Sequence, residues 1–483
     1  MKGLLQTRNI FLGIVVLGLL GTAARNVVDP DIWWHLKTGE YIAASKSVPH
    51  TDLFSYTRAG QPWVAHEWLC DLLIYGLYHA AGWGGLIVVF AAIVCAAFFL
   101  LYRRCAEDPY VSGVLVLFGG WTTAPLWGWG ARPQIVSFFF TSLWLLLLER
   151  SERDLKLLWW TLPLTLLWVN LHAGFALGLV LLVLFLAGEF LEHVLAAAPK
   201  SIFPSRLRAI AITLLLDLLL VPLNPNGATM YRYPFETLRS HAMQSFIAEW
   251  ASPNFHSSNY SPFFLLVLAT VAALAWSRIR VRPRDMVLLL VSLFAALTSI
   301  RMIPLFVLVG LPILSGSVKE WAGPIRPSPR APAAVFLNAV ILVAMAGFVG
   351  FRIAQVVHRQ PDAEAEHFPA AAVAYLQAHG IRGPIFNHYD WGGYLVWKLY
   401  PDTRVFIDGR ADLYGDLLLQ DFVNTYFQAD WQQTVTRWQI QTVIVPPDSA
   451  LATVLRSAKG WSVRYEDPRA VIFSTPESAA TGP

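Results

Sequence analysis

Long apolar stretches separated by short polar segments fill the chain up to about residue 355. About 20 apolar residues are needed to cross a bilayer, and fewer suffice where flanking side chains reach the interface. On this criterion we predict about 11 transmembrane helices, centred near Val16, Ala92, Leu117, Leu143, Leu164, Leu181, Leu214, Val267, Leu290, Leu308 and Ala344. From about Gln360 short apolar runs alternate with polar segments. The pattern therefore predicts an all-α polytopic membrane domain over residues 1–355 and a small C-terminal α/β soluble domain over residues 360–478.

Lys and Arg gather in alternate loops, and this asymmetry predicts the orientation of the chain. One residue from each basic segment represents the pattern: Arg8, Arg103, Arg153, Arg206, Arg280 and Lys319. Because loops rich in Lys and Arg stay in the cytoplasm, we expect a cytoplasmic N-terminus. An odd number of spans then places the tail after Phe351 outside. The first span, which ends at Gly21–Ala24, resembles a signal peptide, but the many later spans favour an uncleaved helix.

Composition agrees with a membrane protein and excludes other classes. Of the 483 residues, 56% are hydrophobic and 14% are charged, whereas about a quarter of a soluble domain is charged. The net charge of +4 is small and does not suggest a nucleic-acid binder, which would carry a basic patch. Cys70, Cys95 and Cys105 have no metal-ligand spacing and predict no disulfide framework.

The first expected outside segment, residues 25–82, holds acidic and aromatic residues at high density. Asp29 and Asp31 directly follow the first span, and His66 and Glu67 lie further along. Two short helices fit this segment, and each has an apolar stripe suited to the membrane surface: Ile32, Leu36, Gly39 and Ala43 in the first, and Trp68, Leu72 and Tyr75 in the second. As an alternative to a functional role, Asp29 or Asp31 could simply cap the first helix.

Other polar residues stand at the ends of spans that we expect to emerge on the same outer face. They are Arg132, Asn170, His172, Glu249 and Arg301. Each alone has a structural explanation, such as an arginine reaching the interface. Together they predict a shared site, because convergent polar groups mark binding cavities. Asp217, inside an apolar run, is as well explained by helix packing as by proton transfer, and we leave it out of the site.

The tail is expected to alternate strands and helices. We predict strands at 385–387, 403–407 and 442–445, helices at 369–379, 393–399, 417–427 and 431–438, then one further helix and a hairpin of 462–465 with 471–474. Asp390 and Trp391 follow the first strand, and Asp408 and Arg410 follow the second. Residues past the carboxyl ends of strands line ligand crevices in α/β sheets, and acids beside aromatic rings suit a sugar. Plain turns are the alternative.

These motifs together resemble the GT-C glycosyltransferases. The resemblance covers roughly Met1 to Trp250 and rests on the acids after the first span, the His66–Glu67 motif, the Arg132–Gln134 element and the Trp168–His172 element. It is strongest to bacterial GT-C-like proteins of unassigned specificity. The stretch at Asp390 and Trp391 is also similar to the Trp-Trp-Asp motif of oligosaccharyltransferases, from which it departs at Tyr389. The resemblance implies a multi-pass enzyme of the bacterial inner membrane, with the C-terminal domain extracytoplasmic.

It further implies a sugar donor linked to polyprenyl phosphate, and leaves the acceptor unidentified. Asp31 or Asp29, and then Glu67, would be the catalytic carboxylate. Arg132 and Arg301 would take the charge of the lipid phosphate, with His172 and His66 as further substrate-binding residues and Asp390, Trp391, Asp408 and Arg410 in the tail. A divalent metal, magnesium or manganese, would bridge Asp29, Asp31 and Glu67, and His35 and His66 could join it.

Two other functions stay open from the residues alone. A transporter or flippase of lipid-linked sugars would be expected to have inverted repeats and broken helices with ionisable groups at mid-bilayer; the sequence has no clear repeat, and only Asp217 meets the second expectation. A non-catalytic protein of envelope assembly, binding a glycan through the tail, fits the tail motifs equally well.

Overall fold

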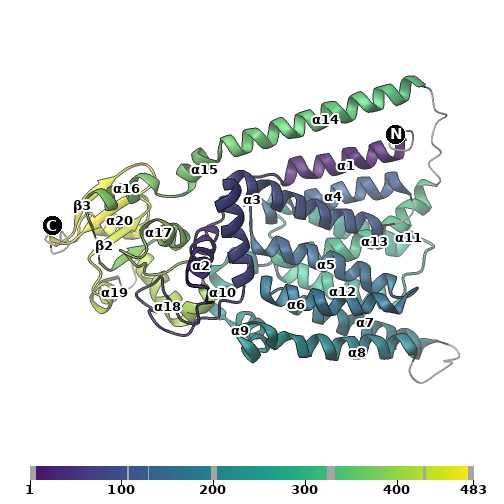
Figure 1. Ribbon diagram of the computed structural model, residues 1–483, viewed down its shortest axis with the longest axis horizontal. Coiled ribbons are helices and arrows are strands. Elements are labelled where there is room, and N and C mark those ends of the chain that lie inside the picture. Colours follow the sequence, from purple (N-terminus) through teal and green to yellow (C-terminus); the bar gives the residue numbers. More distant parts are fainter. Residues whose placement is uncertain are drawn as a thin grey trace. The chain divides into compact units, whose positions relative to one another are not determined.

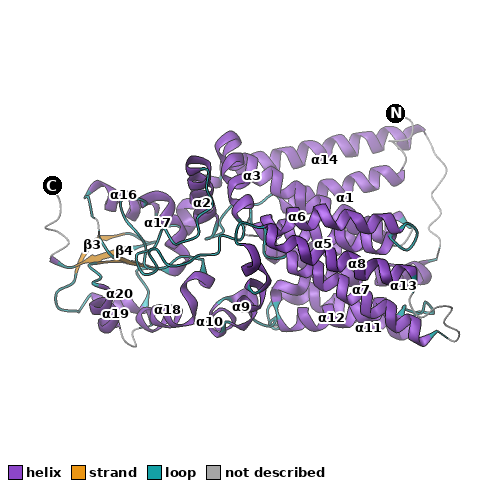
Figure 2. Cartoon of the chain, turned by 60° about the horizontal axis from the view of Figure 1, so that its bottom comes forward, coloured by secondary structure: helices purple, strands orange, loops and turns teal. Residues whose placement is uncertain are grey.

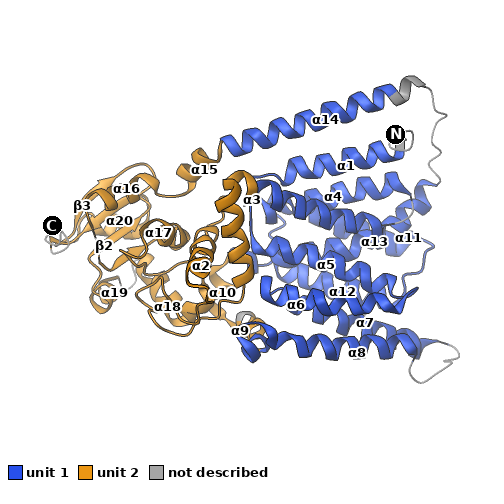
Figure 3. Ribbon diagram, viewed as in Figure 1, with its two compact units in different colours: residues 1–26, 87–231, 248–358 blue, residues 27–86, 232–247, 359–483 orange. Residues whose placement is uncertain are grey.

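The computed structural model describes residues 7–105, 108–128, 130–196, 204–323, 332–381, 383–427 and 431–476. They form two compact units, each built from segments far apart in the sequence (Figure 3). Unit 1 comprises 1–26, 87–231 and 248–358, and unit 2 comprises 27–86, 232–247 and 359–483. One division between the units falls between residues 358 and 359, and the expected division into two domains stays a prediction. Residues 27–86, which make up most of the first expected outside segment, group with the tail instead of the apolar helices.

Unit 1 consists of packed helices (Figure 1). Its longer helices are α1 (Thr7–Ala23), the second part of α3 (Trp68–Arg104), α4 (Pro109–Trp127), α5 (Pro133–Arg150), α6 (Thr161–Leu171), α7 (Phe175–Leu195), α8 (Ser205–Leu220), α11 (Ser261–Trp276), α12 (Pro283–Thr298), α13 (Ile303–Ala322) and α14 (Pro332–His358). Short 3-10 turns connect them at Leu155–Trp160, Val221–Leu223, Gly227–Tyr231, Ala248–Trp250, Ser258–Tyr260 and Ile300–Met302. Each of the predicted span centres lies inside one of these longer helices.

Five helical stretches in the described residues are long and apolar enough to cross a membrane: Trp68–Arg104, Phe175–Leu195, Ser258–Trp276, Ile300–Ala322 and Phe336–His358. Two shorter apolar ones are Arg8–Ala23 and Leu155–Leu171. These helices indicate a membrane protein, while the full number of spans stays a prediction.

Asp217 joins two helices of unit 1. Its side chain is fully buried, and its two carboxylate oxygens accept hydrogen bonds from the hydroxyls of Thr161 (2.8 Å) and Thr165 (2.7 Å). The bonds tie α8 to α6, which satisfies a buried polar group at the point of contact. This arrangement favours the structural interpretation of Asp217.

Unit 2 contains all the strands of the described chain (Figure 2). They form one sheet in the order β1-β2-β4-β3, from β1 (Ile385–Asn387), β2 (Thr442–Val445), β3 (Ser462–Glu466) and β4 (Val471–Ser474). The β1–β2 pair is parallel, and the β2–β4 and β3–β4 pairs are antiparallel. The tail helices are α15 (Gln360–His367), α16 (Ala370–Ala378), α17 (Gly392–Leu399), α18 (Ala411–Tyr426), α19 (Trp431–Trp438) and α20 (Ala450–Leu455), with a 3-10 turn at Tyr389–Trp391.

The predicted tail elements are present with small boundary shifts, except for the strand at 403–407. Only Val405 of that segment forms bridges, to Ile385 and to Ser55 of the first outside segment. Val405 also exchanges backbone hydrogen bonds with Phe54 and Tyr56. Val405, Phe406 and Ile407 are buried, but the partner of this segment is a distant loop that supplies too few pairs for a strand.

The first outside segment folds as α2 (Ile32–Ser45) and the first part of α3. The expectation of two separate surface helices needs two corrections. The predicted second helix continues into the apolar part of α3, with the break at Gly82, whose φ is 58°. The apolar side of α2 is buried inside unit 2, where α2 packs against α17. Gly39 also leaves so little space that an added Cβ would lie 2.2 Å from the Asp71 carbonyl oxygen.

Two further helices of unit 2, α9 (Tyr233–Arg239) and α10 (His241–Phe246), come from the middle of the sequence. The hydroxyl of Ser240, which caps α10, donates to Asp416 of α18 at 2.6 Å. Unit 2 thus draws on three separate parts of the chain.

Candidate active site

Asp31 stands at the start of α2, but its side chain does not cap the helix. Its Oδ1 instead accepts a hydrogen bond from the indole Nε1 of Trp34 at 3.1 Å. An aspartate that capped α2 would accept from a backbone N–H of the first turn. The Asp31 carboxylate is only partly buried, so it combines a fixed position with access to a reacting group.

Asp29 has a different environment. Its side chain is buried, and its Oδ1 accepts from the backbone N–H of Asp31 at 2.8 Å. This is the local bond by which an Asp shapes a turn two residues on. Asp29 therefore orients Asp31, and of the two acids Asp31 is the one more accessible to a substrate.

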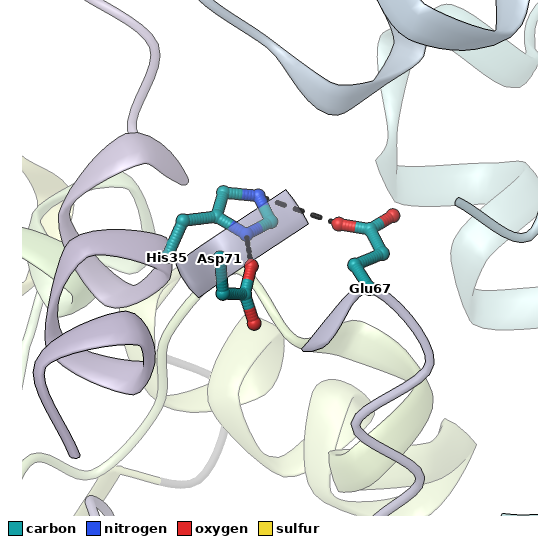
Figure 4. A group of neighbouring side chains, drawn as sticks. All are labelled: His35, Glu67 and Asp71. Atoms are coloured by element: carbon teal, nitrogen blue, oxygen red, sulfur yellow. Dashed lines mark hydrogen bonds and ion pairs between the residues drawn. The ribbon is translucent and has the colours of Figure 1, made fainter. Parts of the chain in front are cut away.

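One turn into α2, His35 lies between the carboxylates of Glu67, which directly precedes α3, and Asp71 in the first turn of α3 (Figure 4). Its Nδ1 is 2.6 Å from Asp71 Oδ1, and its Nε2 is 3.6 Å from Glu67 Oε2. All three side chains are buried, and one ligand atom from each lies within 4.8 Å of the others. This is a group that could hold a metal ion. The expected ligands were Asp29, Asp31 and Glu67, with His35 and His66 as residues that could join them. Of these, the observed group contains Glu67 and His35.

The two neighbouring carboxylates change the pKa of His35. Burial opposes the charged imidazolium, but Asp71, Glu67 and Asp31 outweigh burial and raise the pKa of His35 to about 9. Without a metal, the imidazolium forms a buried ion pair with the carboxylates. A metal would have to displace this proton, because only neutral imidazole is a ligand.

His66 extends the cluster towards the tail. Its Nε2 is 2.9 Å from Glu67 Oε1, and its ring packs on Tyr233 of α9 with centroids 4.3 Å apart. The Tyr233 hydroxyl in turn donates to Asp412 Oδ2 at 3.1 Å. Burial lowers the pKa of His66, whereas Glu67 and Asp412 raise it and prevail. Carboxylates outnumber imidazoles here, so the region stays negative even when both histidines are protonated.

Sequence reasoning missed Asp71, Tyr233 and Asp412 as members of this cluster. The spacing of Glu67 and Asp71 by four residues, on one helical face, was the available signal. No local pattern pointed to Tyr233 or Asp412, because they join the cluster only through the tertiary fold.

Asp408 and Arg410, expected to bind a sugar, are enclosed and bonded to each other. Arg410 donates from Nε to Asp408 Oδ1 (2.8 Å) and from Nη2 to Asp408 Oδ2 (2.6 Å), and its Nη1 is 2.8 Å from Asp52 Oδ1. The side chains of Arg410 and both acids are 0% exposed. No sugar reaches them in this arrangement, which corrects the expectation. Trp391 is likewise buried, whereas Asp390 is exposed.

Arg132 and Arg301 come together in unit 1 through one shared acid. Arg132 Nη1 binds Glu249 Oε1, and Arg301 Nε lies 3.7 Å from Glu249 Oε2. The Arg301 guanidinium also lies over the Trp250 ring, 5.2 Å from its centroid. Burial alone would raise the pKa of Glu249, but the two guanidinium groups outweigh burial and lower it. The trio therefore carries one net positive charge, as an anion-binding site requires.

His172 lies at the end of α6, also in unit 1, and its position explains the Trp168–His172 element. Trp168 Nε1 donates to Ser137 Oγ at 2.7 Å, and Ser137 Oγ is 2.7 Å from His172 Nδ1. The backbone N–H of Gly174 also points at Nδ1, at 2.9 Å. Because Nδ1 accepts, the proton of a neutral ring is assigned to Nε2. The histidine is thereby fixed as a donor through Nε2.

No family model matches the chain, and no curated protein matches it by sequence. Similar solved structures do exist. The oligosaccharyltransferase AglB from Archaeoglobus fulgidus, in complex with an inhibitory peptide and a dolichol-phosphate, matches with a TM-score of 0.56 at 10% identity, over 90% of this chain and 69% of AglB. Apo ArnT from Cupriavidus metallidurans matches with a TM-score of 0.51 at 13% identity, over 98% of both chains. The arabinofuranosyltransferase AftD from Mycobacteria matches with a TM-score of 0.54 at 14% identity, over 97% of this chain but 40% of AftD.

These three proteins are GT-C glycosyltransferases. The chain has a GT-C-like fold. At identities this low the likeness concerns the fold, which by itself does not assign a function. It confirms the family resemblance inferred from the motifs, and it indicates a membrane protein in agreement with the apolar helices.

Proposed function

We propose that this GT-C-like protein is a glycosyltransferase that moves a sugar from a polyprenyl-phosphate donor to an extracytoplasmic acceptor. The observation that carries the proposal is the Asp31 carboxylate, which is accessible, held by Trp34 and free of a capping role. The fold supports the same general class of reaction, because the similar structures are membrane glycosyltransferases.

In the proposed reaction Asp31 takes the proton from an acceptor hydroxyl as the oxygen attacks the anomeric carbon of the donor sugar. The new bond joins the acceptor oxygen to the sugar, and the bond from the anomeric carbon to the phosphate oxygen breaks. The leaving group is the polyprenyl phosphate, which keeps the bonding electrons as negative charge. The proton remains on Asp31 until solvent removes it.

We propose that Arg132 and Arg301 bind the lipid phosphate and neutralise its negative charge. Charge-assisted hydrogen bonds from guanidinium groups to phosphate are among the strongest polar contacts in proteins. Glu249 neutralises one of the two arginines and leaves one positive charge for the phosphate. His172, with its proton assigned to Nε2, supplies a further donor on the same unit.

His35, Glu67 and Asp71 are the residues that would hold a divalent metal. A bound metal would add positive charge to the acidic region and so favour the approach of a phosphate. The expected choice was magnesium or manganese. An imidazole beside two carboxylates suits manganese or zinc better than magnesium, which prefers oxygen ligands and bound water.

Donor turnover tests the proposal directly. Membranes containing the protein, and therefore its native acceptor, would be incubated with a polyprenyl-phosphate sugar labelled in the sugar. We expect label to leave the lipid fraction and free polyprenyl phosphate to accumulate, and the Asp31→Asn protein to show neither. A transporter would move the donor between leaflets with its sugar attached. A glycan-binding assembly protein would leave the donor untouched. Either result with the folded wild-type protein would refute the proposal.

A further inference from the structure

Two glycines of the tail, Gly393 at the start of α17 and Gly409 in the turn before α18, lie directly against the start of α2. A Cβ added at Gly409 would lie 1.6 Å from Asp31 Oδ1 and 3.3 Å from Trp34 Nε1. A Cβ added at Gly393 would lie 2.6 Å from the Pro30 carbonyl oxygen. The backbone at both glycines thus approaches the Pro30–Asp31 segment more closely than a residue with a side chain could.

The Gly409 turn is itself held rigidly by its neighbours. The Asp408 carboxylate accepts three hydrogen bonds from Arg410, which donates from its backbone N, Nε and Nη2. It accepts a fourth from the Tyr414 hydroxyl at 2.8 Å. The Arg410 guanidinium also lies 4.6 Å from the centroid of the Trp63 ring. Its pairing with Asp52 joins the turn to the first outside segment. Because the guanidinium group is planar and its donors are fixed in direction, these contacts hold the turn in one orientation.

We infer that the turn Asp408–Gly409–Arg410 positions Asp31 for the reaction proposed above. Asp31 then has contacts on two sides: the Trp34 indole donates to its carboxylate, and the backbone of Gly409 limits how far the carboxylate can rotate. Gly409 and Arg410 are positioning residues, since neither is placed to touch a substrate. The inference rests on the proposed function, because it concerns the same carboxylate.

The first experiment is a double-mutant cycle on Gly409 and Asp31. In Gly409→Ala the new methyl group would push the carboxylate away by on the order of 1 Å, and a misplacement of that size can cost about a hundredfold in rate. We expect kcat to fall by about ten- to a hundredfold, with an unchanged donor KM and little change in melting temperature. Gly76→Ala is the matched control, because a Cβ at Gly76 meets nothing within 4 Å.

If Gly409 acts through Asp31, the two substitutions will not add. Residues that act as one unit show large non-additivity, so Gly409→Ala should cost nothing further in the Asp31→Asn protein. A Gly409→Ala protein with kcat within about twofold of the wild type, or a fully additive pair, would overturn the inference. By contrast, normal turnover in Asp31→Asn alone would refute the assigned role of Asp31 in the proposed function.

A second experiment measures the contact without activity. Asp31→Cys and Gly409→Cys would be combined after Cys70, Cys95 and Cys105 are replaced by Ala. The short distance between the two side-chain positions is within disulfide reach, so we expect oxidation to link them. The pair Glu40→Cys with Gly409→Cys, whose first site lies more than two turns further along α2, should not link. Equal linking of both pairs, or none in the first, would overturn the placement.

Discussion

Asp31 stands at the start of a helix without capping it. This distinguishes the two interpretations of Asp31, as a helix cap or as a catalytic carboxylate. A capping aspartate is replaced by asparagine with little loss, because both side chains cap helices about equally well. A general base is not, because an amide cannot take a proton. The sequence could place an acid at this point but could not show which atom its carboxylate contacts. That depended on Trp34 one turn later and on a tail residue almost 400 positions away.

We therefore predict that Asp31→Asn folds normally and turns over poorly. Loss of a general base costs on the order of a hundredfold to ten-thousandfold in rate, and the Trp34 contact can persist with the amide oxygen as acceptor. The measurement is single-turnover transfer from labelled donor, with melting temperature recorded in parallel. Asp29→Asn is the internal comparison, since its bond to the Asp31 backbone is also one that asparagine can make. If Asp31→Asn turned over as fast as a fully active Asp29→Asn protein, the base would have to lie elsewhere.

Arg301 allows the donor-binding assignment to be tested without great loss of stability. Its contact with Glu249 is long, at 3.7 Å, and its side chain is 30% exposed. A charge-assisted hydrogen bond contributes about 1.5–3 kcal/mol, so Arg301→Gln should raise the donor KM by roughly tenfold or more. Arg301→Lys, which keeps the charge, should recover part of the loss. Titration with polyprenyl phosphate checks the same point without turnover. If Arg404→Gln, which alters an exposed arginine of the tail, raised the KM equally, the effect would be one of general charge.

At the scale of elements, local patterns predicted what local contacts determine. The tail helices and β1, β2 and the β3–β4 hairpin follow their own hydrophobic periodicity, so their positions were read from the sequence. The segment 403–407 and the surface of α2 were misread because distant partners decide their environment: Val405 pairs with residues of the first outside segment, and α17 covers α2. The same reason applies to the group of His35, Glu67 and Asp71. Glu67 was expected to bind a metal and His35 to join it, but Asp71 was not assigned.

The ends of four helices in unit 1 are joined by an acid that sequence analysis did not single out. Glu152, just after α5, contacts Arg206, Arg282 and Arg284, at the starts of α8 and α12. Arg206 and Arg284 also contact Glu189 of α7. Arg284 is 3% exposed. Burial would raise the pKa of Glu152, but the arginines outweigh burial and lower it to about 2.

We predict that Glu152→Gln lowers stability by about 1–3 kcal/mol. Removing one partner of a buried ion pair costs about 3–5 kcal/mol, and the partial exposure of Glu152 reduces this figure. Because the folded pKa is depressed, the stabilisation is present above the unfolded pKa and is lost as pH falls towards about 2. Thermal melting of wild type and variant across this acidic range measures the difference. Glu466→Gln, which removes an exposed pairing with Arg456, should leave the melting temperature close to that of the wild type, and a loss as large as that of Glu152→Gln would contradict the argument.

At the scale of the whole molecule, the composition of unit 2 constrains the path of the chain through the membrane. Residues 27–86, 232–247 and 359–483 pack as one unit, in which Asp52 forms an ion pair with Arg410 and Ser240 forms a hydrogen bond with Asp416. We therefore expect all three segments to lie on one side of the membrane. On that expectation the chain crosses an even number of times between the first and second segments, and again between the second and third. The predicted span centres give six and four crossings, which satisfies both conditions independently of the Lys and Arg counts.

This constraint leads to a labelling prediction for the orientation. Single cysteines would be placed at Gln61, Gln244 and Gln433, one exposed position in each segment of unit 2, and at Ser205 at the start of α8, in a background without the native cysteines. An impermeant maleimide added to cells with an opened outer envelope should label the first three positions. It should reach Ser205 only after the inner membrane is permeabilised, because Lys- and Arg-rich loops remain cytoplasmic. Labelling of Ser205 alone, with the other three reached only after permeabilisation, would reverse the orientation while preserving unit 2. Labelling of only one or two of the three would be incompatible with unit 2 itself, since its buried contacts cannot form across a bilayer.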